Sequence, residues 1–138
     1  MRAAGEAASV VIAIQEAVPP SLNTYTRLHY HAKTRLRNLW RELLSYALDA
    51  KRQQDKQLLM AWAEEKIPVN IDILVARRRL LDNDNLWGGV KPVLDALKVS
   101  PQGLGWIADD SAAMCKLKVM QVKSQQQSTE IVISPRGA

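Results

Sequence analysis

The segment from Val69 to Val75 is the part of the sequence that most restricts the fold. A valine or isoleucine occupies every second position of this segment, and the positions between them hold asparagine, aspartate and leucine. A period of two is typical of a β-strand that buries one face. The sequence therefore predicts a half-buried strand, and this strand leads directly into the basic stretch Arg77-Arg78-Arg79.

Two elements are predicted before this strand. The apolar run 10–14 indicates a first strand, which ends before Pro19-Pro20. We expect the start of the chain, 1–8, to be frayed, and the polar segment 51–57 to continue or fray a helix that precedes it. That helix has one buried stripe, because apolar residues recur at helical spacing: Leu36, Leu39, Trp40, Leu43, Leu44, Ala47 and Leu48.

Three elements are predicted after it. A helix is expected from about Val90 to Val99, with Pro92 in its first turn, and the pair Gly88-Gly89 should break or delay it. Alternation from 115 to 119 indicates a third strand, and 131–133 a fourth, with 124–128 as a hairpin loop between them. The order strand, helix, strand, helix, strand, strand predicts one small mixed α/β (α+β) sandwich domain over residues 1–138.

Composition limits the classes of protein and of metal site. No apolar run approaches the roughly 20 residues that span a bilayer, and no signal pattern precedes the first strand, so we expect a cytoplasmic protein. The net charge of +5 mildly favours a polyanionic partner. One cysteine and two histidines, His29 and His31, are too few for a usual zinc cage. Any metal should be oxygen-bound; Cys115 is expected to be a core thiol, and the histidines to lie in a loop or contact phosphate.

Two acidic pairs carry the chemistry that the sequence suggests. Asp82 and Asp84 lie between the half-buried strand and the next helix, and two such carboxylates can share one Mg²⁺. Asp109 and Asp110 follow that helix, which is expected to return them to the same end of the sheet. The alternatives remain open, because Asp82 or Asp84 can cap the helix and the second pair can form a solvated turn.

Lys91 precedes Asp95 by four residues on the second predicted helix. This spacing is that of a surface ion pair. Alternatively, the ammonium group reaches the acidic cluster and stabilises the charge that develops in phosphoryl transfer.

Several of these segments resemble, in the same order, the RusA family of Holliday junction resolvases. They are Pro-Pro-Ser-Leu-Asn at 19–23, the arginines at 77–79, Asp-Asn-Asp-Asn-Leu at 82–86, Lys91 before Asp-Ala-Leu at 95–97, and Trp-Ile-Ala-Asp-Asp-Ser at 106–111. The resemblance covers nearly the whole chain, and its acidic segments are the specific ones. The chain departs from the family by an apparent insertion of Trp-Gly-Gly at 87–89.

The resemblance implies a homodimeric endonuclease that needs Mg²⁺, or Mn²⁺ in its place, and resolves four-way DNA junctions by symmetrical nicks. Many members are encoded by phages and prophages. Asp82, Asp84 and Asp110 match the catalytic aspartates, and Lys91 matches the catalytic lysine. Asp109 and Asp95 match positions that are acidic in relatives, and Asp109 is a further candidate metal ligand.

Six basic residues are the predicted DNA-phosphate contacts: Arg77, Arg78, Arg79, Arg27, Lys33 and Arg35. Three tryptophans, Trp40, Trp62 and Trp87, are candidates for an apolar dimer interface, although core or partly exposed packing is the simpler explanation of each. Two other functions remain open: a DNA-binding protein without catalysis, and a metal-dependent nuclease or phosphatase acting on other substrates.

Overall fold

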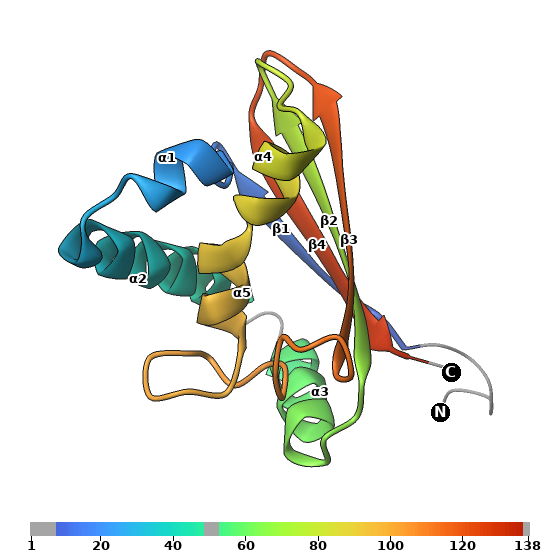
Figure 1. The fold of residues 1–138 in the computed structure, drawn as a ribbon. Coiled ribbons are helices and arrows are strands. Elements are labelled where there is room, and N and C mark those ends of the chain that lie inside the picture. Colours follow the sequence, from blue (N-terminus) through green and yellow to red (C-terminus); the bar gives the residue numbers. More distant parts are fainter. Residues whose placement is uncertain (1–7, 49–52, 137–138) are drawn as a thin grey trace.

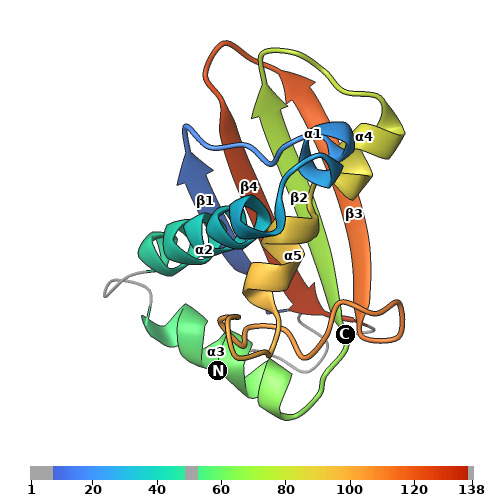
Figure 2. The same cartoon turned by 60° about the vertical axis from the view of Figure 1, so that its left-hand side comes forward.

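The computed structural model describes residues 8–48 and 53–136, which form a sheet and a layer of helices packed on it (Figure 1). In chain order the elements are β1 (Val10–Gln15), α1 (Leu22–Thr26), α2 (Tyr30–Ala47), α3 (Gln53–Glu64), β2 (Val69–Arg77), α4 (Asn83–Gly88), α5 (Lys91–Leu97), β3 (Cys115–Lys123) and β4 (Ser128–Pro135). Figure 2 shows α1, α2, α4 and α5 in front of one face of the sheet. The predicted mixed α/β class is confirmed.

The sheet has the strand order β1-β4-β2-β3, so the last strand of the described chain lies inside the sheet. β2 runs parallel to β3 and antiparallel to β4. The predicted hairpin between the third and fourth strands is wrong, because β2 separates them. Their connection crosses the end of β2, where the N–H of Ser124 donates to the carbonyl of Arg77 at 2.9 Å.

One apolar face of the sheet forms the core, as the alternating sequences predict. Every second residue of β1 and β2 is buried, and the intervening residues of β2 are half-buried. β3 is an edge strand that carries exposed lysines at 116, 118 and 123, and charged side chains discourage pairing with another chain. The buried side chains make one hydrophobic cluster in the described part of the chain.

The helix α2 contains the predicted stripe but begins at Tyr30, six residues before Leu36. Trp40, Leu44 and Leu48 are fully buried, whereas Leu39 is 48% exposed and lies outside the stripe. Leu39 is one position before Trp40, and adjacent helical positions point about 100° apart, so only one of the two can face the sheet.

Three helices were not predicted as separate elements: α1, α3 and α4. The sequence-based interpretation assigned 51–57 to the end of the preceding helix. Residues 49–52 lie outside the described residues, and α3 starts at Gln53 and buries Leu59, Trp62 and Ala63. α4 precedes the glycine pair, which breaks the helical segment as expected: Gly88 is the last residue of α4, and α5 begins at Lys91.

The second predicted helix is confirmed as α5, with Pro92 in its first turn. It ends at Leu97, and Val99 is 59% exposed beyond it. At the start of the chain, residues 1–7 lie outside the described residues, and Ala8 packs against the core. Among the described helices, none has the length and hydrophobicity to cross a bilayer.

Candidate active site

Asp82 is the residue on which α4 begins. Its carboxylate Oδ1 accepts a hydrogen bond of 2.9 Å from the backbone N–H of Asn85, which is the geometry of an N-cap. Asp82 therefore caps the helix, which was one of the two alternatives for this residue. Asp84 lies in the first turn of the same helix, and its exposed side chain makes no hydrogen bond or ion pair with the other described residues.

A glutamine of β3 holds the segment that leads into Asp82. The side chain of Gln121 donates to the carbonyl of Leu81 at 2.6 Å and accepts from its N–H at 3.0 Å. Because Gln121 is level with Val75 in the parallel register, the chain folds back along the sheet after β2 ends at Arg77. Asp82 consequently lies on the helix side of the sheet edge, beside β3.

Asn85 orients the carboxylate of Asp82 and connects it to a distant segment. Its Nδ2 donates to Asp82 Oδ1 at 3.1 Å, and its Oδ1 accepts from the backbone N–H of Asn23 at 2.9 Å. The segments 19–23 and 82–86, which both carry the resemblance to RusA resolvases, therefore meet at one side chain. Asn85 was not among the predicted site residues, although an asparagine three positions after an aspartate cap was a usable signal.

The glycine pair allows the same two segments to pack closely. A Cβ atom added to Gly89 would lie 1.8 Å from the carbonyl oxygen of Pro20, and one added to Gly88 would lie 2.7 Å from the Leu22 side chain. Any larger residue at 89 would force these backbones apart. The apparent insertion at 87–89 thus forms the end of α4 and the surface on which α1 rests.

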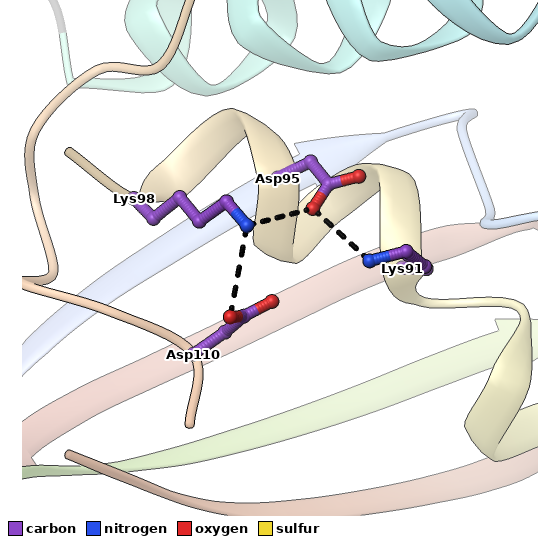
Figure 3. Close-up of polar contacts among 4 residues, drawn as sticks. All are labelled: Lys91, Asp95, Lys98 and Asp110. Carbon is purple, nitrogen blue, oxygen red and sulfur yellow. Dashed lines mark hydrogen bonds and ion pairs between the residues drawn. The ribbon is translucent and has the colours of Figure 1, made fainter. Parts of the chain in front are cut away.

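Asp110 reaches α5 rather than α4. Its Oδ1 is 3.7 Å from Lys98 Nζ, and the same ammonium group is 3.4 Å from Asp95 Oδ1. Lys91 Nζ is also 3.4 Å from Asp95 Oδ1, so the four side chains form one chain of alternating charges (Figure 3). The structure therefore contains the ion pair between Lys91 and Asp95 that was one of the two alternatives for Lys91. Lys98 is a residue of this cluster that the sequence-based interpretation missed.

Asp109 is exposed and lies shortly before the turn at 112–114. The pKa of Asp109 lies below its ordinary value, chiefly because the backbone N–H of Asp110 donates to its carboxylate, with the hydroxyl of Ser111 as a further donor. Smaller contributions in the same direction come from the side chain of Asp110 and from the charge of Lys98. The second acidic pair therefore precedes the turn at 112–114 and does not form it.

The expectation that the two acidic pairs return to the same end of the sheet is wrong. β2 and β3 are parallel, with Val69 level with Cys115 and Arg77 level with Lys123. A crossover between parallel strands starts the second strand at the opposite end, roughly 25 Å away for strands of this length. Asp82 and Asp110 therefore approach the helix layer from opposite ends of the sheet, and within the described residues no three His, Cys, Asp or Glu side chains are grouped closely enough to hold a metal ion.

The six predicted DNA contacts differ in exposure. Arg77 is 6% exposed, and its Nη2 donates to the carbonyl of Pro19 at 3.2 Å. Burial lowers the pKa of Arg77. The prediction that Arg77 contacts DNA therefore fails for a physical reason, since the guanidinium group is inside the protein and fastens the segment before α1.

The other basic side chains are available to solvent. Arg78 Nε donates to the carbonyl of Gln125, and the side chain lines a hollow of about 520 Å³ with Gln15, Glu16, Gln125, Gln126 and Gln127. Arg79, Arg27 and Arg35 are exposed, and Lys33 is half-buried with its Nζ 5.3 Å from the centre of the Tyr25 ring. These five residues remain candidates for phosphate contacts.

The remaining predictions concern single side chains. Cys115 is a buried thiol, as expected. His29 and His31 are exposed at the start of α2, where His29 is the N-cap residue. Trp40 and Trp62 belong to the core, whereas Trp87 is 42% exposed.

The donor chemistry of the site fits Mg²⁺. The candidate ligands are carboxylates, and Mg²⁺ is usually held by one or two of them together with waters and a substrate phosphate, not by a closed protein cage. Asp82 and Asp84, two residues apart at the start of α4, supply two such oxygen donors. Asp110 carries the third carboxylate, which is paired with Lys98.

Comparison of the chain with models of known protein families, and with curated proteins, finds no match.

Proposed function

We propose that this chain is a Mg²⁺-dependent endonuclease that cuts branched DNA, in particular four-way junctions, as a homodimer with one site per protomer. The observation that carries the proposal is the pair Asp82 and Asp84 at the start of α4. One carboxylate is oriented by Asn85, and the other is exposed and has no hydrogen-bond or ion-pair partner among the described residues. The choice of a DNA junction as substrate rests on the resemblance to RusA resolvases.

The residues of the site would have the following roles. Asp82 and Asp84 would hold Mg²⁺, which is usually bound through one or two protein carboxylates together with waters and a substrate phosphate. When bound, the ion would polarise the scissile phosphate and acidify a water molecule. Lys91, which is 57% exposed and has one acidic partner, is free to contact the phosphate. Arg78 and Arg79 lie on the segment that precedes Asp82, where flanking phosphates would pass.

The basic surface supports a polyanionic substrate. Arg78, Arg79, Arg27, Lys33 and Arg35 would contact phosphates without reading bases. Each phosphate neutralised on duplex DNA contributes about −0.9 to the slope of log K against log salt. The affinity of the dimer for a junction should therefore fall steeply as salt is raised.

One structural observation favours a second candidate, a DNA-binding protein without catalysis. Asp82 caps a helix and Asp110 is ion-paired, so each has a role that needs no metal. The two candidates differ in what Asp84→Asn should do, because Asp84 has no such role.

The test compares cleavage of a four-way junction, a flap, a duplex and a single strand by the wild type and Asp84→Asn, with Mg²⁺. We expect paired nicks in the junction from the wild type and none from the variant, with junction binding in Ca²⁺ nearly unchanged. Equal cleavage by both proteins would refute the assigned site. Binding without cleavage of any substrate by the wild type would identify the silent DNA-binding protein, and preferred cleavage of another structure would identify a different nuclease.

A further inference from the structure

Two aromatic rings lie on the surface where α2 begins. Tyr30 is the first residue of α2 and is 76% exposed, and the ring of the neighbouring His31 meets the Tyr30 ring edge-on, with 5.5 Å between their centres. On the preceding helix, α1, the ring centre of Tyr25 is 5.3 Å from Lys33 Nζ. The connection from α1 to α2 therefore carries aromatic and basic side chains next to one another.

The segment that contains these rings has no acidic residue. Aspartate and glutamate are absent between Glu16 and Glu42, whereas arginine or lysine occurs at 27, 33, 35, 37 and 41. Arg27 and Arg35 are exposed, and Lys33 is half-buried. A surface that combines cations with exposed rings attracts phosphates and also offers a flat apolar face to bases. The chemistry of this surface therefore fits a nucleic acid better than a polyanion without bases.

The start of α2 is connected to the candidate active site through α1. The backbone N–H of Asn23 on α1 donates to Asn85 Oδ1 at 2.9 Å, and Asn85 donates in turn to the carboxylate of Asp82. Figures 1 and 2 both show α1 between α4, which begins after Asp82, and the start of α2. A DNA strand that passes Asp82 therefore has only α1, a helix of five residues, to cross before it reaches Tyr30.

Exposed rings favour DNA in which some bases are unpaired. In a regular duplex each base is covered by its neighbours, so a side chain reaches the face of a base only where the base has left the stack. Stacking on an aromatic ring depends little on which base it is, because every base has a flat π face. Branched DNA interrupts the stack at its branch point, and the proposed substrate therefore offers such bases.

We propose that the start of α2 binds unpaired DNA bases, with Tyr30 as the ring on which a base stacks and with Arg27, Lys33 and Arg35 on the adjoining phosphates. This role rests on the proposed function, because it takes DNA as the substrate, but it does not involve the metal ion. Tyr30 is a binding residue and takes no part in the cleavage step.

Tyr46 provides a matched control for Tyr30. It lies near the other end of α2 and is 82% exposed, but it lines a hollow together with Glu42 and Arg41, where the charge is mixed. Tyr46→Ala therefore removes an exposed tyrosine from the same helix without changing the basic surface. Tyr30→Phe is the conservative variant, since it keeps the ring and removes only the hydroxyl group.

The experiment measures binding of a labelled single strand of about 15 nucleotides by fluorescence anisotropy in EDTA. A second strand of the same length has abasic analogues in place of its nucleosides, so it keeps the phosphates and lacks the bases. We expect Tyr30→Ala to bind the first strand about 5- to 100-fold more weakly than the wild type. Tyr30→Phe and Tyr46→Ala should stay within about twofold of the wild type, and on the abasic strand all the proteins should bind equally.

The outcomes separate this role from the nuclease proposal. Equal binding of the first strand by Tyr30→Ala and the wild type would refute the stacking role, and so would an equal loss on both strands; neither result bears on Mg²⁺-dependent cleavage. The expected loss by Tyr30→Ala in a protein that cuts no DNA would support the stacking role and refute the nuclease. A wild type that binds neither strand would refute the stacking role. If Tyr30→Ala does not fold, Tyr30→Leu makes the same test with a bulky side chain that has no ring.

Discussion

The backbone N–H of Asn23 and the side-chain Oδ1 of Asn85 are joined by a hydrogen bond of 2.9 Å, although 62 residues separate them. The same Asn85 side chain donates to the carboxylate of Asp82. Asn85 therefore holds α1 against α4 and at the same time sets the direction of a candidate metal ligand.

Asn85→Ala should lower the free energy of unfolding by about 1–2 kcal/mol, because it leaves the N–H of Asn23 without its partner. Asn83→Ala is the matched control, since the side chain of Asn83 is exposed on the same helix and makes no hydrogen bond with the described residues. The control substitution should lower the free energy of unfolding by less than about 0.5 kcal/mol. Urea denaturation followed by circular dichroism measures both, and equal effects would show that the hydrogen bond to Asn23 contributes nothing.

The two roles of Asp82, as helix cap and as candidate metal ligand, can be distinguished by two different substitutions. Asp82→Asn retains a good N-cap oxygen, so its stability should match the wild type within a few tenths of a kcal/mol, whereas Asp82→Ala should lose about 1 kcal/mol. Both variants remove the negative charge and should lose Mg²⁺-dependent cleavage. A fully active Asp82→Asn would mean that Asp82 is a cap and nothing more.

Substitutions of Arg77 and Arg79 should change different properties of the protein: the stability for Arg77 and the salt dependence of DNA affinity for Arg79. Arg77→Met removes the donor to the buried carbonyl of Pro19 and should cost about 1–3 kcal/mol of stability. Arg79→Ala should leave stability unchanged and reduce the slope of log affinity against log salt by about 0.9 for each phosphate that Arg79 neutralises. Urea denaturation measures the first effect and junction binding at several salt concentrations the second. A reduced salt slope for Arg77→Met would place Arg77 on the DNA after all.

Cys115 should make the stability fall at high pH. Burial, with a smaller contribution from Asp110, raises the pKa of this thiol from the ordinary value of 9.0 to about 11. Between these values the unfolded chain releases a proton that the folded chain keeps, so the free energy of unfolding decreases as pH rises through this window. Below pH 9 both forms keep the proton and the effect is absent.

The measurement compares the wild type with Cys115→Ala by urea denaturation from pH 8 to pH 11. The wild type should lose stability faster than the variant between pH 9 and 11, by at most about 1.4 kcal/mol per pH unit. Parallel curves would show that the thiol titrates normally in the folded protein.

The predictable part of this fold is the part governed by local periodicity. The alternation in β2 and the stripe of α2 identify their elements because each pattern reflects one buried face. Leu39 was misassigned to the buried stripe because it is apolar, like the residues of the stripe, and adjoins one of them in the sequence. The glycine pair separates two helices, as expected, since α4 ends at Gly88 and α5 begins at Lys91. The helix before the pair, α4, was not predicted, and its glycines allow close contact with Leu22 and Pro20.

The site was less predictable than the fold because it depends on which strands are neighbours. The sequence around Asp82 and Asp110 contains no information on strand direction, and the parallel pairing of β2 with β3 places the two acidic pairs at opposite ends. The burial of Arg77 has the same origin, since three successive arginines look alike until the strand ends between the first and the second. Lys98 was missed because its two partners come together only through the loop from 99 to 109.

The position of β4 has a consequence for synthesis of the protein on the ribosome. β4 is made after the other three strands, yet it lies between β1 and β2. Until it emerges, β1 has no neighbour in the sheet and one edge of β2 is unpaired, a state in which exposed strand edges favour aggregation. The nascent chain therefore cannot complete its sheet strand by strand from the N-terminus, and the arrangement that supports Asp82 and Asp110 forms only as translation reaches the last strand.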